Sequence, residues 1–401
     1  AASIAPVPVG SVDGAPVLGY VFPTTLDPQD VGFSGIEGTV ALAVTSHPDF
    51  DDTPLWDEDG NAHYDDDGIV YHPHWVVLTE DTDAPAGLAV PSAPEGSGLP
   101  PTAPMPMYLD SPGFTVIEDG ASLRVLIPLD RVRRRTDFEV GALTALMRVD
   151  ASGELPSLKV EHVLSALDDG NAVVPVESAA SAPAAAWPTK SEDDGGLTLE
   201  DASGRYDAAV DTFVLSMNVS TIAATNIPDP TGQINGAPVL GYAFPTTISP
   251  SAVGFKNIEG TLALAVTSHP DFDDTPYWDE SLDGEFGNDG SVYHVHWVVL
   301  VEDPASDAGL SVPSADPDAL PPTAPMPMYL DSPGYHAFAA GDALHVLIPG
   351  WHLPTVEQFS FDALTARMRV DASGDRPVLR VEEVIDLLSG DLSLPLSVSR
   401  Q

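Results

Sequence analysis

The chain has 401 residues with 15 Lys and Arg against 61 Asp and Glu, and its formal net charge of −46 repels nucleic-acid phosphates. Apolar residues make up 43% of the sequence, which excludes an intrinsically disordered acidic tail, and the absence of cysteine excludes disulfide bonds and thiolate ligands. No apolar run reaches about eighteen residues, so we expect no transmembrane segment.

Short strands follow one another along the chain, because runs of Val, Ile, Thr, Leu and aromatic residues alternate with clusters of Gly, Pro and Asp. In the first half the predicted strands are 15–23, 38–47, 69–80, 121–130 and 142–151. The expected fold is therefore all-β, with an antiparallel β-sandwich as its unit.

Two later segments have a different apolar pattern. Residues 160–167 and 381–388 carry apolar side chains three and four apart, as short amphipathic helices do. One short helix in each half of the chain therefore stays an alternative to a further strand.

The sequence contains an internal duplication. The motif GAPVLGYVFPTT from Gly14 returns as GAPVLGYAFPTT from Gly236, and TSHPDFDDTP at 45–54 returns unchanged at 267–276. Repetition at a nearly constant offset indicates a tandem duplication of one domain. The fold prediction is thus two copies of the β-sandwich.

A segment rich in Ala, Ser and Pro, and then in acidic residues, separates the two copies. It predicts a first domain over 1–177, a linker over 178–196 and a second domain over 197–401. Residues 206–224 have strand character without a full equivalent in the first copy. They are either an extra strand of the second domain or one contributed to the first.

The most informative stretch is 46–75, which holds four histidines and nine acidic residues in thirty positions. If the strands at its two ends pair antiparallel, His47 lies opposite His72 and His74. The last two share a strand face, since they are two residues apart. All three recur in the second copy as His269, His294 and His296.

Three converging imidazoles suit zinc, copper or iron, and a carboxylate commonly completes such a set. Asp49 and Asp271 are the first carboxylate candidates, because each follows its histidine by two residues. We predict one transition-metal site per repeat, with copper or zinc favoured and iron as a further candidate. The predicted ligands are His47, Asp49, His72 and His74 in the first repeat, and His269, Asp271, His294 and His296 in the second. The alternative is that these histidines are structural and hydrogen-bond the backbone or the acidic loop.

Two other patterns concern metals. The acidic segments 57–68 and 279–290 resemble a calcium-binding loop in part, but both lack its final glutamate, so a solvated loop is the simpler interpretation. A Met-Pro-Met tripeptide is also duplicated, and thioethers near imidazoles would favour Cu(I), whereas core packing is the ordinary role of methionine. Its methionines are Met105 and Met107, and Met326 and Met328.

The source and location are expected to be saline and extracytoplasmic. Acidic, lysine-poor surfaces suit high salt, which screens their self-repulsion, and the lysines are only Lys159, Lys190 and Lys256. The sequence begins AASIAPVPVG without an initiator Met, as a mature periplasmic or extracellular protein of a halophilic or marine cell would. A trimmed chain, or an acidic protein from a GC-rich genome, would look the same.

The predicted function is binding or delivery of copper or zinc by an exported protein. A metalloenzyme that uses the same histidines with an open coordination position is the first alternative. An adhesion or envelope module with structural histidines is the second. No catalytic residue emerges, because the sequence has neither a G-x-S-x-G nor an H-E-x-x-H motif. Metal ions are the expected partners, and the sequence leaves the oligomeric state open.

Overall fold

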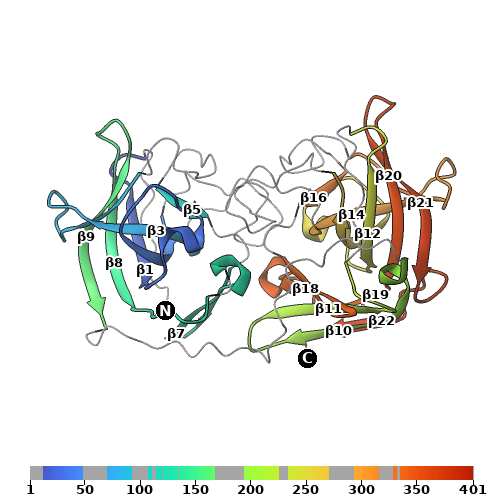
Figure 1. Ribbon diagram of the computed structural model, residues 1–401, viewed down its shortest axis with the longest axis horizontal. Helices are drawn as coiled ribbons and strands as arrows, with labels where there is room; N and C mark the ends of the chain where they lie inside the picture. Colours follow the sequence, from blue (N-terminus) through green and yellow to red (C-terminus); the bar gives the residue numbers. More distant parts are fainter. Residues whose placement is uncertain are drawn as a thin grey trace. The chain divides into compact units, whose positions relative to one another are not determined.

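Strands dominate the computed structural model of the protein (Figure 1). The structure describes residues 12–47, 70–92, 107–110, 114–120, 122–133, 135–167, 194–224, 234–270, 293–315, 328–331 and 335–400. Contacts divide the chain into two compact units, with the described residues up to 167 in the first and those from 194 in the second. Most of the predicted linker lies outside the described residues, so the domain boundaries stay a prediction.

The first unit is built around one antiparallel sheet. Its strands are β1 (Pro16–Pro23), β2 (Thr39–Ser46), β3 (His72–Glu80), β4 (Leu88–Pro91), β5 (Tyr108–Asp110), β8 (Leu143–Asp150) and β9 (Ser157–Ala166). The strand order is β2-β1-β8-β9-β4-β3-β5, and β3 also pairs with β2. That last pairing connects β2, at one end of the sheet, to β3 and closes six of the seven strands into a ring, as in a small β-barrel. A hairpin of β6 (Thr115–Asp119) and β7 (Ser122–Leu126), with the short 3-10 helices η1 (Pro28–Val31) and η2 (Leu129–Val132), accompanies it.

The second unit repeats this sheet strand for strand. Its strands are β12 (Pro238–Pro245), β13 (Thr261–Ser268), β14 (His294–Glu302), β15 (Leu310–Val312), β16 (Tyr329–Asp331), β20 (Leu364–Asp371) and β21 (Val378–Leu387). The order β13-β12-β20-β21-β15-β14-β16, with β13 also paired to β14, is the same closed arrangement. The prediction of a tandem duplicated, antiparallel all-β domain is therefore confirmed.

The second unit also has strands beyond the barrel. A four-stranded sheet has the order β10-β11-β18-β17, and β19 pairs with β22. Their bounds are β10 (Leu199–Asp207), β11 (Thr212–Val219), β17 (His336–Ala340), β18 (Ala343–Pro349), β19 (Gln358–Phe361) and β22 (Leu396–Ser399), with 3-10 helices η3 (Asp194–Leu197), η4 (Pro250–Val253) and η6 (Gly350–His352). Because β11 pairs with β18, segment 206–224 belongs to the second unit and is not contributed to the first.

The short-helix alternative is wrong, because segments 160–167 and 381–388 fall in β9 and β21, apart from the last residue of each. The register of β8 with β9 pairs Met147 with Val160 and Ala145 with Val163, so a bulge inserts one extra residue in β9. Val160 and Val163 therefore share a face although they are three residues apart. This bulge produced a spacing that resembles a helix.

Each barrel interior is filled with small and medium apolar side chains. In the first unit this inner cluster is Ala15, Val17, Val21, Ala41, Ala43, Val76, Leu78, Val90, Met107, Tyr108, Ala145, Met147, Val149, Leu158 and Val160. A second cluster, which includes Leu42, Trp75 and Val77, covers the outer face of β2 and β3. The β2–β3 hairpin is therefore buried on both faces, which is unusual for strands that carry histidines.

Candidate metal centre

The predicted antiparallel hairpin around the acidic stretch is present in both units. In the first, Thr45 pairs with His72 and Ala43 with His74. Residues directly opposite on paired strands share a face, so both histidines belong to the face that carries Ala43 and the rest of the inner cluster. In the second unit Thr267 pairs with His294 and Ala265 with His296.

The three predicted histidines of the first unit come together at the end of the barrel where β2 ends and β3 begins. The ring centroids of His47 and His72 are 4.7 Å apart, those of His72 and His74 are 4.5 Å apart, and those of His47 and His74 are 5.8 Å apart. One ring nitrogen from each lies within 4.8 Å of the others. Their exposed fractions are only 4%, 7% and 3%, so solvent hardly reaches them.

The second unit has the same arrangement. The ring centroids of His269 and His294 are 4.6 Å apart, those of His294 and His296 are 4.4 Å apart, and those of His269 and His296 are again 5.8 Å apart. The ligand atoms again lie within 4.8 Å of one another. His269 and His296 are buried and His294 is half-buried. We refer to these two groups as the first and second His triads.

One hydrogen bond in the second triad prepares an imidazole for a metal. His269 Nδ1 lies 3.1 Å from the Pro270 carbonyl oxygen, which can only accept, so Nδ1 carries the proton. In the neutral ring the lone pair is then on Nε2, the atom that faces His294 Nε2 at 3.0 Å. A backbone carbonyl that orients the far nitrogen of a histidine in this way is common around metal ligands.

The spacing of the nitrogens is close to that of a coordinated pair. Two nitrogens bound to one tetrahedral zinc ion at about 2.0–2.1 Å are about 3.3 Å apart. The 3.0 Å between His294 Nε2 and His269 Nε2 therefore needs only a small adjustment, together with transfer of the His294 proton from Nε2 to Nδ1, so that the Nε2 lone pair can bind. The ring stays neutral in this change of tautomer, as a histidine that ligates a metal is.

A tyrosine that was not predicted packs against each triad. The ring centroid of Tyr108 is 4.4 Å from that of His74, and Tyr329 stands at 4.4 Å from His296. Both tyrosines are buried and come from the short strands β5 and β16. Such packing restricts the rotation of the imidazole beneath. The duplicated motif MPMYLD contains both residues, and its position after the Met-Pro-Met tripeptide was the available signal.

The carboxylate part of the prediction is not tested. Asp49 and Asp271 lie outside the described residues, and the metal-ligating groups found among the described side chains consist of histidines alone. The strand register pairs Asp110 with His74 and Asp331 with His296. These two aspartates follow the tyrosines in the same duplicated motif, so they are new positions to consider.

Of the other predicted metal features, the structure describes only Met107 and Met328. Met107 and Met328 are buried among the apolar residues of the barrel interiors, which supports the packing role. Met105 and Met326 lie outside the described residues, as do the acidic segments 57–68 and 279–290.

Three imidazoles supply three neutral nitrogen ligands and leave at least one coordination position for another group. Catalytic zinc sites have three protein ligands and a fourth position for water, whereas structural zinc sites are closed by four. Each triad can therefore hold a metal, and a fourth ligand decides what the metal does. No protein-family model matches the chain, and no curated protein or solved structure matches it either.

Proposed function

We propose that this protein binds two transition-metal ions, one in each barrel, through the two His triads. The observation that carries the proposal is that three imidazoles, all buried except the half-buried His294, converge to within 4.8 Å at the same end of both barrels. A single hydrogen bond accounts for the 3.0 Å between the Nε2 atoms of His294 and His269, but it does not account for the third imidazole, His296. A metal ion gives that convergence a physical reason.

Copper or zinc fits the ligand set better than other common metals. Calcium and magnesium prefer oxygen ligands, and the frequent non-haem iron site uses two histidines with one carboxylate. Imidazole ligands alone suit zinc and copper. The net charge of −46 further favours retention of a divalent cation whose three histidine ligands are neutral.

The burial of the triads supports firm retention over rapid transfer. A carrier that hands over its metal needs an accessible ligand, and the most accessible histidine is His294, which is half-buried. We therefore propose a site that keeps its ion, with delivery as a slower process through the end that carries His47 and His269.

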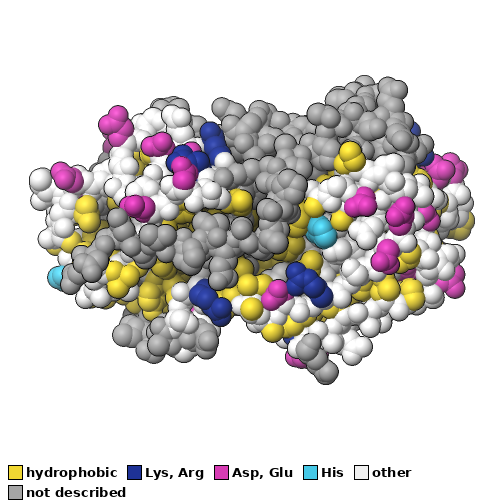
Figure 2. Space-filling model, turned by 60° about the horizontal axis from the view of Figure 1, so that its bottom comes forward, with side chains coloured by type: hydrophobic (Ala, Val, Ile, Leu, Met, Phe, Trp, Pro, Cys, Tyr) yellow, Lys and Arg dark blue, Asp and Glu magenta, His cyan; other side chains and the backbone are white. Residues whose placement is uncertain are grey.

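Export into saline surroundings completes the proposal. Figure 2 shows Asp and Glu side chains scattered over the described surface, with fewer Lys and Arg. High salt screens the repulsion between these acidic side chains, so such a surface supports the proposal of a saline environment. Among the described residues no helix is both long and apolar enough to cross a membrane.

A second candidate function is that of a metalloenzyme. It is favoured by one observation, that only three described side chains converge on each centre, which leaves a coordination position for a substrate or water. The metal in that case would polarise or activate the molecule that occupies this position.

The proposed function is tested by metal analysis of native, tag-free protein. We expect about two equivalents of copper or zinc, about one in His72→Ala, and none in the double variant His72→Ala, His294→Ala. The matched control is His162→Ala, His345→Ala, which removes one histidine outside the triads from each unit. A folded native protein that stays metal-free after incubation with copper, zinc and iron would contradict the proposal.

A further inference from the structure

The second barrel contains a small internal cavity. Its volume is about 30 Å³, and its lining is apolar apart from the hydroxyl of Thr267. Alanine, valine, leucine and methionine side chains from six of the barrel strands form the wall. A water molecule in a buried site needs two to four polar partners, so a cavity with a single hydroxyl favours an apolar occupant.

This cavity lies beside the second His triad. Thr267 and Ala265 both line it, and they are the residues that pair directly with His294 and His296. Side chains paired in this way have Cβ atoms about 4.5–5.5 Å apart on the same face of the sheet. The cavity therefore occupies the layer of the barrel interior next to the triad.

A glycine contributes to this wall. A Cβ atom at Gly241 would lie 2.7 Å from Met368 Cε and 3.2 Å from Thr267 Cγ2, so any side chain there would displace its neighbours. The Met368 methyl group fills the space that a side chain at Gly241 would take, so the glycine lets Met368 pack against this strand as part of the cavity wall.

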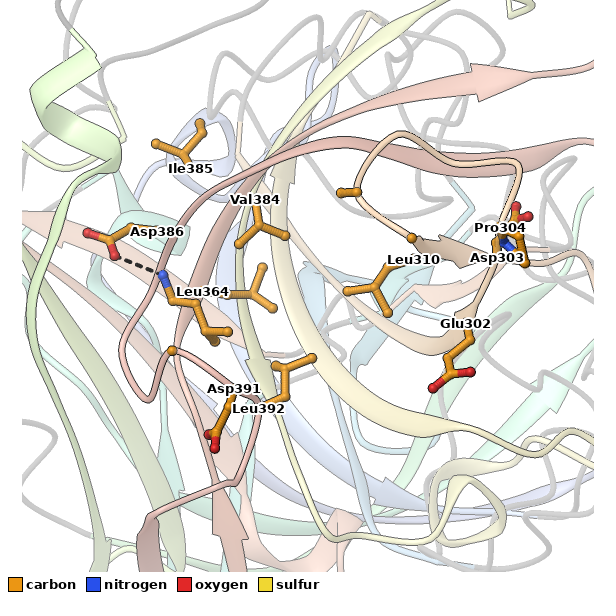
Figure 3. Close-up of a pocket in the computed structure, with 14 residues that line it drawn as sticks. Glu302, Asp303, Pro304, Leu310, Leu364, Val384, Ile385, Asp386, Asp391 and Leu392 are labelled. Atoms are coloured by element: carbon orange, nitrogen blue, oxygen red, sulfur yellow. Dashed lines mark hydrogen bonds between the residues drawn. The ribbon is translucent and has the colours of Figure 1, made fainter.

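The same cavity approaches solvent at the other end of the barrel. An open pocket of about 780 Å³ begins where β14 ends at Glu302. Leu310, Leu364 and Val384 line both this pocket and the internal cavity, and Figure 3 shows their side chains in the pocket wall. Three apolar side chains therefore separate the pocket from the cavity, and all three can move without breaking a hydrogen bond.

We propose that the cavity admits a small apolar molecule of the dioxygen class from the open pocket to the metal in the second triad. The inference rests on the proposed metal site, and it assigns a substrate class to the open coordination position. Dry apolar cavities bind apolar gases such as xenon, which serves as a probe for dioxygen access. Polar substrates are excluded by the same lining.

The two repeats provide the controls. Ala243 in the cavity wall corresponds to Val21 in the first barrel, and its neighbours Gly241 and Ala265 correspond to Gly19 and Ala43. Ala243→Val therefore fills the cavity with a residue that the same fold already accepts. Val21→Ala makes the opposite change in the first barrel.

The experiment is methyl NMR of the metal-free, full-length protein under xenon pressure and then under dioxygen pressure. We expect saturable xenon shifts and dioxygen-induced relaxation at the methyl groups of Ala265 and Thr267. Both effects should be lost in Ala243→Val, and Val21→Ala should create them at Ala43. Leu364→Ala, which removes part of the wall between pocket and cavity, should accelerate xenon exchange.

An absence of saturable xenon shifts in the native protein would overturn the proposal, as would unchanged shifts in a folded Ala243→Val variant. Metal analysis of native protein, which has not been stripped of metal, is independent of both results. A protein that binds metal without xenon retains the proposed function and loses this inference. A protein that binds xenon without metal retains the apolar cavity but loses the proposed function, and with it the delivery of dioxygen to a metal.

Discussion

The two barrels agree most closely where the histidines meet and differ most in what surrounds them. In both triads the first and third rings, His47 with His74 and His269 with His296, have the same 5.8 Å separation and 28° interplanar angle. The four-stranded sheet of the second unit, by contrast, has only the β6–β7 hairpin as its counterpart among the described residues of the first. The triad is therefore a property of the barrel hairpin and does not depend on the added strands.

The packing behind the hairpin gives a finer comparison. Trp75 meets Phe114 with ring centroids 6.1 Å apart, and Trp297 meets Tyr335 at 6.0 Å with nearly the same angle. The tyrosine hydroxyl accepts a hydrogen bond from Trp297 Nε1 at 3.1 Å. The apolar contact alone thus sets the geometry, and the hydroxyl adds a hydrogen bond to it.

The largest expected effect is the loss of one ion at a time. His74→Ala should weaken metal binding in the first barrel by more than about 100-fold, because even changes behind a ligand cost about 10- to 100-fold. The second barrel should keep its affinity, and His296→Ala should give the mirror result. Competition with a chelator measures both affinities. Simultaneous loss from both barrels in either variant would show that the sites are coupled.

A carboxylate substitution sharpens the comparison between candidate fourth ligands. Asp110→Asn and Asp331→Asn remove the acidic groups at the positions paired with His74 and His296. Because residues paired across two strands share a face of the sheet, we expect each substitution to weaken its own metal site by about 10- to 100-fold, the usual cost of losing a group that supports a ligand. Asp49→Asn is the matched comparison, and a larger effect from that variant would favour the predicted ligand Asp49 over Asp110.

Tyr242 connects the second barrel to the segments that precede it in the second unit. Its hydroxyl accepts the Ala224 N–H and donates to the Gly196 carbonyl, and burial raises the pKa of Tyr242 to about 12. Tyr242→Phe should lower the free energy of unfolding by about 1–3 kcal/mol, because it leaves buried backbone groups without their partner. Denaturant unfolding measures this loss.

The pH dependence of the same residue has a definite sign. A raised folded pKa means that the neutral phenol is favoured, so this contribution is complete below the unfolded value of about 10. It disappears as the pH rises through about 12. Tyr242→Phe should therefore flatten the alkaline limb of the stability profile, and an unchanged limb would contradict the assignment.

Trp297 and its counterpart Trp75 predict opposite changes in stability for substitutions at Tyr335 and Phe114. Tyr335→Phe should cost about 0.5–1.5 kcal/mol through the lost hydrogen bond to Trp297. Phe114→Tyr should stabilise the first unit by a similar amount, since Trp75 Nε1 is buried without a hydrogen-bond partner among the described residues. Thermal unfolding of the two variants checks both signs. Destabilisation by Phe114→Tyr would show that the first unit has no room for the hydroxyl.

The smallest expected effect is the loss of stability when Asp150 or Asp371 is replaced, and it should be of the same size in both barrels. The hydrogen bond from Ser152 lowers the pKa of Asp150 to about 2, and Ser373 does the same for Asp371. A lowered folded pKa contributes stability above the unfolded value of about 3.9, and this is lost as the pH falls toward 2. Asp150→Asn and Asp371→Asn should each reduce stability slightly at neutral pH. Acid titrations of the two variants should coincide, and unequal shifts would reveal a difference in the turns.

Sequence patterns were sufficient to predict that the histidines converge, but they were insufficient to predict that the sheet closes into a barrel. The H-x-H spacing and the duplication predicted the hairpin and its three converging imidazoles, because both follow from the two-residue period of a strand. Closure could not be predicted, since alternation says which residues share a face and not which strands pair. The bulge at Val163 disguised a strand as a helix. Tyr108 was missed because the duplicated motif MPMYLD marks the residue but not the pairing of β5 with β3, which places it against His74.

The double burial of the β2–β3 hairpin has a kinetic consequence. Backbone amides covered on both faces exchange their hydrogens only through the largest unfolding events, whereas edge strands and loops open at lower cost. Amides around Ala43 and Val76, and around their counterparts Ala265 and Val298, should therefore be among the slowest to exchange. The strands that bear the histidines would be the last to separate, and an ion bound between them would outlast most of the native structure.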